Sequence, residues 1–370
     1  MLADTPRLHA YVAALTETVT TDSVVLDLGC GPGYFALLAA RLGAKRVYAV
    51  EPDPVIQFAR EAAIANKLSD QIEFFECLSS EVTLAEKAHI IISDLRGVLP
   101  LYQRNLPSII DARNRLLAPK GILIPRRDQL LAAPVDAPDK YADIVAPWQE
   151  NDLDLSAARS AATNTWRKAH LKPEQILASP VCWATLNYNE LESFDCRGAI
   201  SWLVERSGIA HGVSVWFDSE LTAEIGFSNH PKEPELIYGN GFFPFSQPVA
   251  VVKGDRIELG LSADFIRDDY VWRWDTIIID GESLQTKATF KQSTLYGVAL
   301  SPNKLHRQAA TYKPSLNQKG HVENFILQSM TGERSLEEIA TRVAERFPDA
   351  YCDWKDALSD VTTLSLEFSR

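Results

Sequence analysis

Residues 23–33 read SVVLDLGCGPG, an apolar run that ends in three glycines at alternate positions. The run from Ser23 to Leu28 has the length and β-branched content of a buried strand, and Tyr34 to Leu42 has helical spacing. Glycines between a strand and a helix let the backbone approach a ligand closely, and the helix N-terminus presents free N–H groups. This stretch therefore predicts a ligand site at the carboxyl end of the first strand.

Short apolar strands continue to alternate with helical segments as far as about residue 125, which is typical of βαβ units. The pattern predicts an α/β fold with a doubly wound, Rossmann-like sheet. We expect further strands at residues 46–50, 72–76, 89–93 and 121–125, and further helices at residues 54–66 and 106–117.

The middle of the chain changes to an alternation of period two, for example at residues 257–261, which predicts a mostly antiparallel, β-barrel-like domain. The Ala-rich stretch from Asp152 to His170 is expected to form an inserted helix, either an arm or a lid. Near the end, Ser335 and Glu338 form a capping box before a helix with one apolar face, which favours a small winged-helix module. The expected domains are residues 1–125, 126–303 and 304–370.

The composition excludes several classes of function. A net charge of −12 argues against nucleic acid held through phosphate contacts. The five cysteines are scattered, without a Cys-x-x-Cys pair or a Cys/His cluster at zinc spacing, so we expect reduced thiols in the cytoplasm and no metal site. The first residues lack the apolar segment of a signal peptide, and no apolar stretch approaches the ~18 residues of a membrane span.

The glycine loop differs from two common phosphate-binding loops. No G-x-x-x-x-G-K-[ST] sequence occurs, and the third glycine comes one position too early for G-x-G-x-x-G. Glu51 ends the second strand, 18 positions after Gly33, where a carboxylate can accept both hydroxyls of a ribose. This pattern resembles the S-adenosylmethionine (SAM) site of class I methyltransferases. The resemblance implies SAM as cofactor, S-adenosylhomocysteine as product, and these cofactor-binding residues: Asp27, Gly29, Gly31, Gly33 and Glu51.

Longer stretches resemble protein arginine methyltransferases over about residues 1–300. They are MLADTPRLHAY at 1–11, VLDLGCGPGYFALLAARLGAKRVYAVE at 25–51, HIIISD at 89–94 and HGVSVWFDSEL at 211–221. The resemblance implies that Arg7 binds the methionine carboxylate of SAM. It also implies that Ser80 and Glu81, at the position of an acidic pair, lie near the adenine. A homodimer through the 152–170 arm is a further implication.

The loop SDLRGVLPLYQ at residues 93–103 matches the substrate loop of that family, S-E-W-M-G-Y-x-x-x-Y-E, which carries two glutamates. Asp94 and Gln103 stand at the glutamate positions, and Arg96 stands at the methionine position. The family's Thr-His-Trp element, expected near residues 243–245, is absent. A guanidinium has a pKa above about 12 and needs carboxylates to orient it and to accept its charge. We therefore expect an acceptor other than a standard arginine.

Asp94, Arg96 and Gln103 are the candidate catalytic residues. Methyl transfer from a sulfonium is an in-line displacement, so positioning supplies much of the rate. The sharpest hypothesis is a carboxylate acceptor that Arg96 holds at two points, and amine, amide or imidazole acceptors beside Asp94 are alternatives. In a simpler reading, Arg96 faces solvent and Asp94 caps the next turn. An arginine N-methyltransferase with a modified site, a small-molecule methyltransferase and a non-catalytic scaffold also stay open.

Residues 312–370 are similar to PqqD-like peptide-recognition domains. The matched elements include a Tyr-Lys-Pro strand at 312–314, the 336–347 helix and a final helix near 358–366. The resemblance implies that a ribosomally made precursor peptide is the substrate and that its leader is bound by strand addition. A helical cap without a ligand is the alternative.

Overall fold

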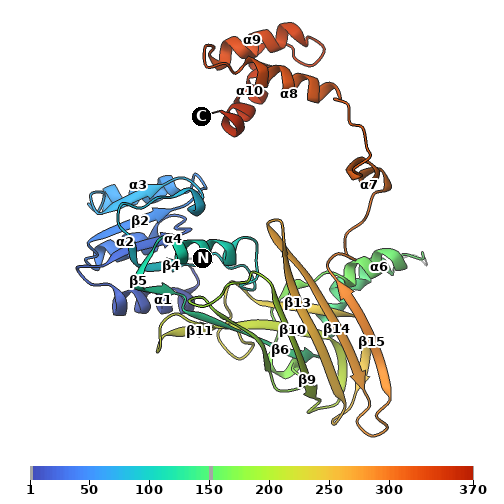
Figure 1. Ribbon diagram of the computed structural model, residues 1–370. Coiled ribbons are helices and arrows are strands. Elements are labelled where there is room, and N and C mark those ends of the chain that lie inside the picture. Colours follow the sequence, from blue (N-terminus) through green and yellow to red (C-terminus); the bar gives the residue numbers. More distant parts are fainter. Residues whose placement is uncertain (1–2, 150–152, 370) are drawn as a thin grey trace. The chain divides into compact units, whose positions relative to one another are not determined.

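A computed structural model describes residues 3–149 and 153–369 (Figure 1). The chain divides into two compact units, residues 1–299 and 300–370. Each unit is described by itself, and the division into three domains stays a prediction. Within the described residues, no helix is long and apolar enough to cross a membrane.

The larger unit begins with a parallel sheet of five strands in the order β3-β2-β1-β4-β5 (Figure 1). Alternate residues of β1 pack on opposite faces: one face is covered by α1, α2 and α3, and the other by α4. Strand order reverses beside β1, which is where open α/β sheets bind their ligands. The strands are β1 (Val24–Leu28), β2 (Arg46–Val50), β3 (Ile72–Phe75), β4 (Ala88–Ser93) and β5 (Leu117–Ile124), and the helices are α1 (Thr5–Thr18), α2 (Tyr34–Arg41), α3 (Ile56–Ala65) and α4 (Asn105–Arg115).

The predicted doubly wound sheet is confirmed, with one difference in β5. This strand begins at Leu117, whereas the sequence predicts its start at Gly121. Leu117 pairs with Ala88, and the register then shifts before Ile122 pairs with Ile90. Lys120 has a φ of +62° within this irregularity. The Pro-Lys-Gly sequence therefore marks a break in register within the strand, and the sequence prediction included only the part of the strand after this break.

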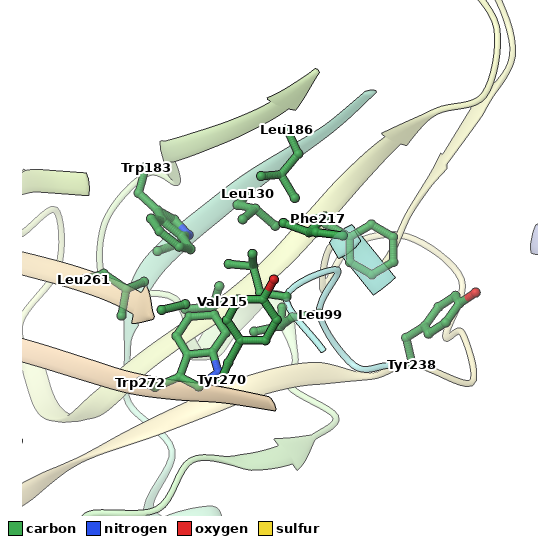
Figure 2. Packing of buried hydrophobic residues seen from close by; sticks show 14 of the residues in the cluster. Leu99, Leu130, Trp183, Leu186, Val215, Phe217, Tyr238, Leu261, Tyr270 and Trp272 are labelled. Carbon is green, nitrogen blue, oxygen red and sulfur yellow. The ribbon is translucent and has the colours of Figure 1, made fainter. Parts of the chain in front are cut away.

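Two antiparallel sheets follow, as predicted. The first has the order β7-β12-β10-β6-β8 with β11 beside β10, and the second has the order β15-β14-β13-β9. Apolar side chains from both sheets enclose a core that includes Phe217, Leu261 and Trp272 (Figure 2). The strands are β6 (Arg127–Val135), β7 (Arg167–Ala169), β8 (Val181–Asn187), β9 (Cys196–Leu203), β10 (Gly208–Glu220), β11 (Gly226–Ser228), β12 (Asn240–Val251), β13 (Arg256–Ile266), β14 (Asp269–Ile279) and β15 (Thr286–Ser293).

The inserted helix predicted from Asp152 to His170 is shorter than expected. Asp152 lies outside the described residues, and the helix that forms is α6 (Ser156–Thr163), preceded by α5 (Pro138–Val145). Residues 167–169 pair with β12 as the edge strand β7, so the prediction of helix is wrong there. Trp166 stacks on Phe243 with ring centroids 5.7 Å apart. This packing favours an extended backbone at residues 167–169 over the helical propensity of the segment.

The smaller unit is helical. Its helices are α7 (Pro302–Gln308), α8 (Gln318–Ser329), α9 (Leu336–Arg346) and α10 (Trp354–Phe368). The last three share a core that includes Ile326, Ile339 and Val361. The capping box is confirmed, because Ser335 and Glu338 exchange hydrogen bonds at the start of α9.

The strand expected at residues 312–314 does not form: these residues have no regular secondary structure, so the prediction is wrong there. No strand occurs between residues 300 and 369. The winged-helix description of this module is therefore not confirmed.

Candidate active site

The glycine loop after β1 is held from both sides. The Asp27 carboxylate is buried and accepts a hydrogen bond from the Ala36 N–H in α2 at 2.8 Å. Burial raises the pKa of Asp27 to about 7, against the opposing effect of that hydrogen bond. Gly33 has a φ of +81°, and a Cβ there would lie 2.5 Å from the Ala59 Cβ. Gly31 has a φ of +51°, and its Cβ would meet only open space. The loop therefore packs tightly at Gly33 and is open for a ligand at Gly31.

Glu51 follows β2 beside this loop, as the sequence predicts for a ribose acceptor. Its Oε2 accepts the Gly31 N–H at 3.0 Å, and its Oε1 accepts the Asp53 N–H at 3.1 Å. A carboxylate oxygen has more than one acceptor position, so both oxygens can also take ribose hydroxyls. These contacts fit the predicted role of Glu51 toward SAM.

A cavity of about 240 Å³ lies at the carboxyl ends of β1 and β2. Apolar side chains and a few polar groups line it, which suits a nucleoside. Gly29, Ser80 and Gln103 are among the lining residues. Glu81 is exposed, and its carboxylate accepts the Leu78 N–H at 3.0 Å as a local cap. A direct contact of Glu81 with adenine stays a prediction.

Arg7 and Asp94 come together although 87 residues separate them. Arg7 projects from α1 and forms a buried ion pair with Asp94, which follows β4. The Tyr238 hydroxyl lies 2.7 Å from each carboxylate oxygen of Asp94 and accepts a hydrogen bond from Arg7 Nε at 2.9 Å. Arg7 Nη1 is buried and has no hydrogen-bond partner in the described part of the chain. A buried N–H without a partner is costly, so this atom fits the carboxylate of SAM.

Arg96 is enclosed by the protein, so the reading in which it faces solvent is wrong. Its Nη1 donates to Asp128 Oδ1 at 3.2 Å and to Ser219 Oγ at 2.8 Å. Its Nη2 donates to the Tyr11 hydroxyl at 3.3 Å, and its Nε lies 3.4 Å from Asp94 Oδ1. Although burial lowers the pKa of Arg96, its acidic and phenolic neighbours raise it well above the ordinary value. These contacts do not support two-point binding of a substrate carboxylate, and a catalytic role for Arg96 stays a prediction.

Gln103 lines the cavity and also connects the loop to the antiparallel part. Its backbone has a φ of +40°, and its N–H donates to Asp269 Oδ1 at 3.3 Å. The neighbouring Arg104 pairs with Asp268 at 2.7 Å. The loop from Asp94 to Gln103 thus connects the parallel sheet, at the end of β4, to the turn between β13 and β14. The catalytic roles of Asp94 and Gln103 stay predictions.

Arg7, Asp94 and Arg96 form a buried polar cluster with residues from other elements. Sequence reasoning missed three members of this polar cluster: Tyr11, Asp128 and Tyr238. Tyr11 stands four residues after Arg7 on the same helix, so the i, i+4 spacing is a signal that could have revealed it. Asp128 and Tyr238 carry no such local signal. At residues 243–245, the Phe-Pro-Phe side chains replace the Thr-His-Trp element, and both phenylalanines are buried.

Comparisons with known proteins agree with this geometry. Residues 9–125 match the family model of ribosomal protein L11 methyltransferase (PrmA), and residues 126–277 match the arginine methyltransferase oligomerization subdomain. The first part of the chain is thus similar to a ribosomal protein L11 methyltransferase, and the part after it is similar to the oligomerization subdomain of arginine methyltransferases. SAM as the cofactor agrees with the glycine loop and with Glu51.

The curated relatives carry arginine methyltransferase names. Probable protein arginine N-methyltransferase 6 of Arabidopsis thaliana is 31% identical over 60% of this chain and 53% of its own length. Protein arginine N-methyltransferase 2 of Mus musculus is 29% identical over 70% of this chain and 61% of its own length. The chain thus spans less than two thirds of these relatives.

Solved structures share the fold of this core. Protein arginine methyltransferase 10 of Arabidopsis thaliana superposes with a TM-score of 0.70 at 24% identity, over 79% of this chain and 95% of its own. The Trypanosoma brucei PRMT1 enzyme–prozyme heterotetrameric complex with AdoHcy gives a TM-score of 0.72 at 22% identity, over the same shares. The predicted resemblance to this family is confirmed for fold, whereas no comparison supports the PqqD-like assignment of the tail.

Proposed function

We propose that the chain is a SAM-dependent methyltransferase that modifies a guanidinium nitrogen of a peptide or protein. The observation that carries this proposal is Asp94, a buried carboxylate at the carboxyl end of β4, fixed by Arg7 and Tyr238 between the glycine loop and the antiparallel sheets. The names of the relatives favour arginine over the other acceptors expected from sequence. An arginine N-methyltransferase with a modified site, the alternative in the sequence analysis, is therefore better supported than an acceptor other than arginine.

The residues have separate roles in this proposal. Bound SAM supplies a methyl group on a sulfonium, and the electron pair of the broken S–C bond stays on sulfur. Arg7 and Glu51 would hold the cofactor through its carboxylate and its ribose. Asp94 orients the acceptor nitrogen for in-line attack, and the proton that the nitrogen loses passes to Asp94 or to water.

The charges of the cluster weaken its attraction for a cation. Arg7 and Arg96 balance Asp94 and Asp128, so the four formal charges sum to zero. Gln103 adds no charge where the resembled family has a glutamate. A neutral acceptor is therefore the second candidate, and this charge balance is the observation that favours it. The carboxylate version is less favoured, since Arg96 is already paired.

The experiment compares acceptor peptides and a Gln103 variant. Methyl transfer from labelled SAM would be measured with arginine-containing peptides and with matched peptides that carry lysine instead. We expect transfer to arginine only, and Gln103→Glu should lower KM by about tenfold, because one added carboxylate–guanidinium hydrogen-bonded pair is worth about 1.5 kcal/mol. Transfer to the lysine peptides, or no transfer to the arginine peptides, would contradict a guanidinium acceptor. An unchanged KM in Gln103→Glu would mean that the side chain of residue 103 does not contact the guanidinium.

Recognition of a leader peptide by residues 304–370 stays a hypothesis without support from the comparisons. It can be tested by removing these residues and measuring KM for precursor peptides with and without their leader. A leader that lowers KM for the full chain but not for the shortened chain would support the hypothesis. A homodimer through the 152–170 segment likewise stays a proposal, and it is tested by sedimentation of the wild type beside Ala157→Glu, an exposed position on α6.

A further inference from the structure

Tyr238 brings a phenol from the antiparallel part of the chain to the Asp94 carboxylate. Its hydroxyl lies 2.7 Å from both carboxylate oxygens. The same hydroxyl accepts a hydrogen bond from Arg7 Nε at 2.9 Å. A phenol has one donor proton, so this acceptor bond leaves the proton free for the carboxylate. Tyr238 is thus connected both to Asp94, the proposed contact of the methyl acceptor, and to Arg7, the proposed contact of the cofactor.

The Tyr238 ring is fixed by aromatic neighbours and is only 4% exposed. Phe217 meets it edge-on at 5.4 Å, and Phe227 lies nearly parallel to it at 6.2 Å. Figure 2 shows the ring at the margin of the buried cluster, with its hydroxyl directed away from the other labelled side chains. The hydroxyl is therefore preorganised toward the polar cluster before any substrate binds.

The backbone beside Tyr238 is tied to the start of α1, the helix that carries Arg7. The Ile237 N–H donates to Asp4 Oδ2 at 2.8 Å. Gly239 has a φ of +60°, and its carbonyl accepts a hydrogen bond from the Asn229 side chain. Anchors on both sides of Tyr238 therefore hold it at a set distance from Arg7 and Asp94.

We propose that Tyr238 is a positioning residue for methyl transfer, which holds the Asp94 carboxylate in the orientation that receives the acceptor. This inference rests on the proposed function. Gln103 is neutral, so Asp94 is the one carboxylate at the two glutamate positions of the loop, while Arg7 and Arg96 both attract it. A neutral donor fixes the carboxylate against these attractions without adding another charge.

The test is a double-mutant cycle of Tyr238→Phe and Asp94→Asn, with Tyr270→Phe as the matched control. Tyr270 belongs to the same core, and its hydroxyl donates to the Phe194 carbonyl at 3.1 Å instead of to Asp94. Steady-state methyl transfer to arginine peptides gives kcat and KM, calorimetry gives the Kd of S-adenosylhomocysteine, and thermal unfolding confirms that each variant is folded.

We expect Tyr238→Phe to lower kcat by about tenfold or more while KM and the Kd change less than about threefold, since positioning is expressed in the transition state. In the Asp94→Asn background, the same change should lower kcat by less than about twofold, because its effect passes through Asp94. Tyr270→Phe should behave as the wild type.

Three results would overturn the inference. An unchanged kcat in Tyr238→Phe removes the positioning role, and equal losses in both backgrounds show that Tyr238 does not act through Asp94. A loss of kcat that is matched by an equal rise in the Kd places Tyr238 on the cofactor side. A wild-type chain that methylates no arginine peptide would instead refute the proposed function, and the inference with it.

Discussion

At the scale of single residues, the cofactor loop depends on two carboxylates with different surroundings. Glu51 accepts backbone N–H groups from its own turn and from the glycine loop, and it borders the open side of that loop. Asp27 is buried under the loop and holds the first turn of α2. Removal of Glu51 should therefore affect binding, whereas a change at Asp27 should affect stability.

Glu51→Ala should weaken the binding of S-adenosylhomocysteine by about tenfold or more, which corresponds to roughly 1.4 kcal/mol. The reason is the loss of the acceptor for the ribose hydroxyls. Isothermal titration calorimetry measures the effect, and Glu61→Ala, on the exposed side of α3, is the control. Equal affinities of Glu51→Ala and the wild type would mean that the carboxylate does not contact the ribose.

Asp27 should make the folded chain less stable as the pH rises. Burial raises its folded-state pKa to about 7 from the ordinary 3.8, so between these values the native state keeps a proton that the unfolded chain has lost. The free energy of unfolding then falls with rising pH, by up to about 4 kcal/mol across this window.

Asp27→Asn keeps an acceptor for the Ala36 N–H and should remove this dependence. Urea unfolding at pH 5 and at pH 7.5 measures it, with Asp70→Asn as the exposed control. Parallel pH profiles of Asp27→Asn and the wild type would contradict the assignment.

At the scale of elements, a buried network of ion pairs and hydrogen bonds joins the loop after the parallel sheet to the antiparallel sheets. Arg96, from the loop after β4, pairs with Asp128 on β6, whose other oxygen accepts the Tyr188 hydroxyl at 2.6 Å. The Arg96 guanidinium also lies over the Phe217 ring, 5.1 Å from its centroid. Buried charges of this kind cost much when one partner is lost, even where the intact pair adds little net stability.

Arg96→Met should destabilise the chain by about 3–5 kcal/mol, because Asp128 is left buried without a counter-charge. Arg96→Met combined with Asp128→Asn should recover most of that loss. Free energies of urea unfolding measure both. As a control, Arg197→Met removes an exposed pair with Asp264 and should cost less than about 1 kcal/mol. A double variant no more stable than Arg96→Met would show that the unpaired Asp128 is not the cause.

At the scale of the whole molecule, the chain consists of two units with separate cores. Ile339 on α9 is buried among α8, α9 and α10, and this core shares no residue with the cores of the larger unit. Units with separate cores are expected to unfold in separate transitions unless a large apolar interface couples them.

Differential scanning calorimetry should therefore show two transitions. Ile339→Ala removes buried methyl groups and should destabilise the smaller unit by about 2–5 kcal/mol, so the transition with the smaller enthalpy moves to lower temperature. The larger transition should stay in place, and Glu337→Ala, exposed on the same helix, should move neither. A single transition that shifts as a whole in Ile339→Ala would contradict the independence of the two units.

The sequence by itself determined the features that depend on local spacing. Alternating strands and helices predicted the doubly wound sheet, DxGxGxG with Glu51 predicted the cofactor loop, and Ser335 with Glu338 predicted the start of α9. Such patterns are readable because period and capping involve residues within one turn or one strand of each other. The short edge strand β7 was missed, because its extended backbone follows from pairing with β12.

Only the tertiary structure decided how the acceptor side is built. Tyr238 reaches Asp94 across 144 residues, and Asp128 reaches Arg96 across 32 residues. From sequence, Arg96 could be an anchor for substrate or an exposed side chain, and its enclosure by Asp128, Ser219 and Tyr11 rules out the exposed side chain. The charge and orientation of a buried side chain depend on partners that the fold brings from other elements, and no local pattern encodes them.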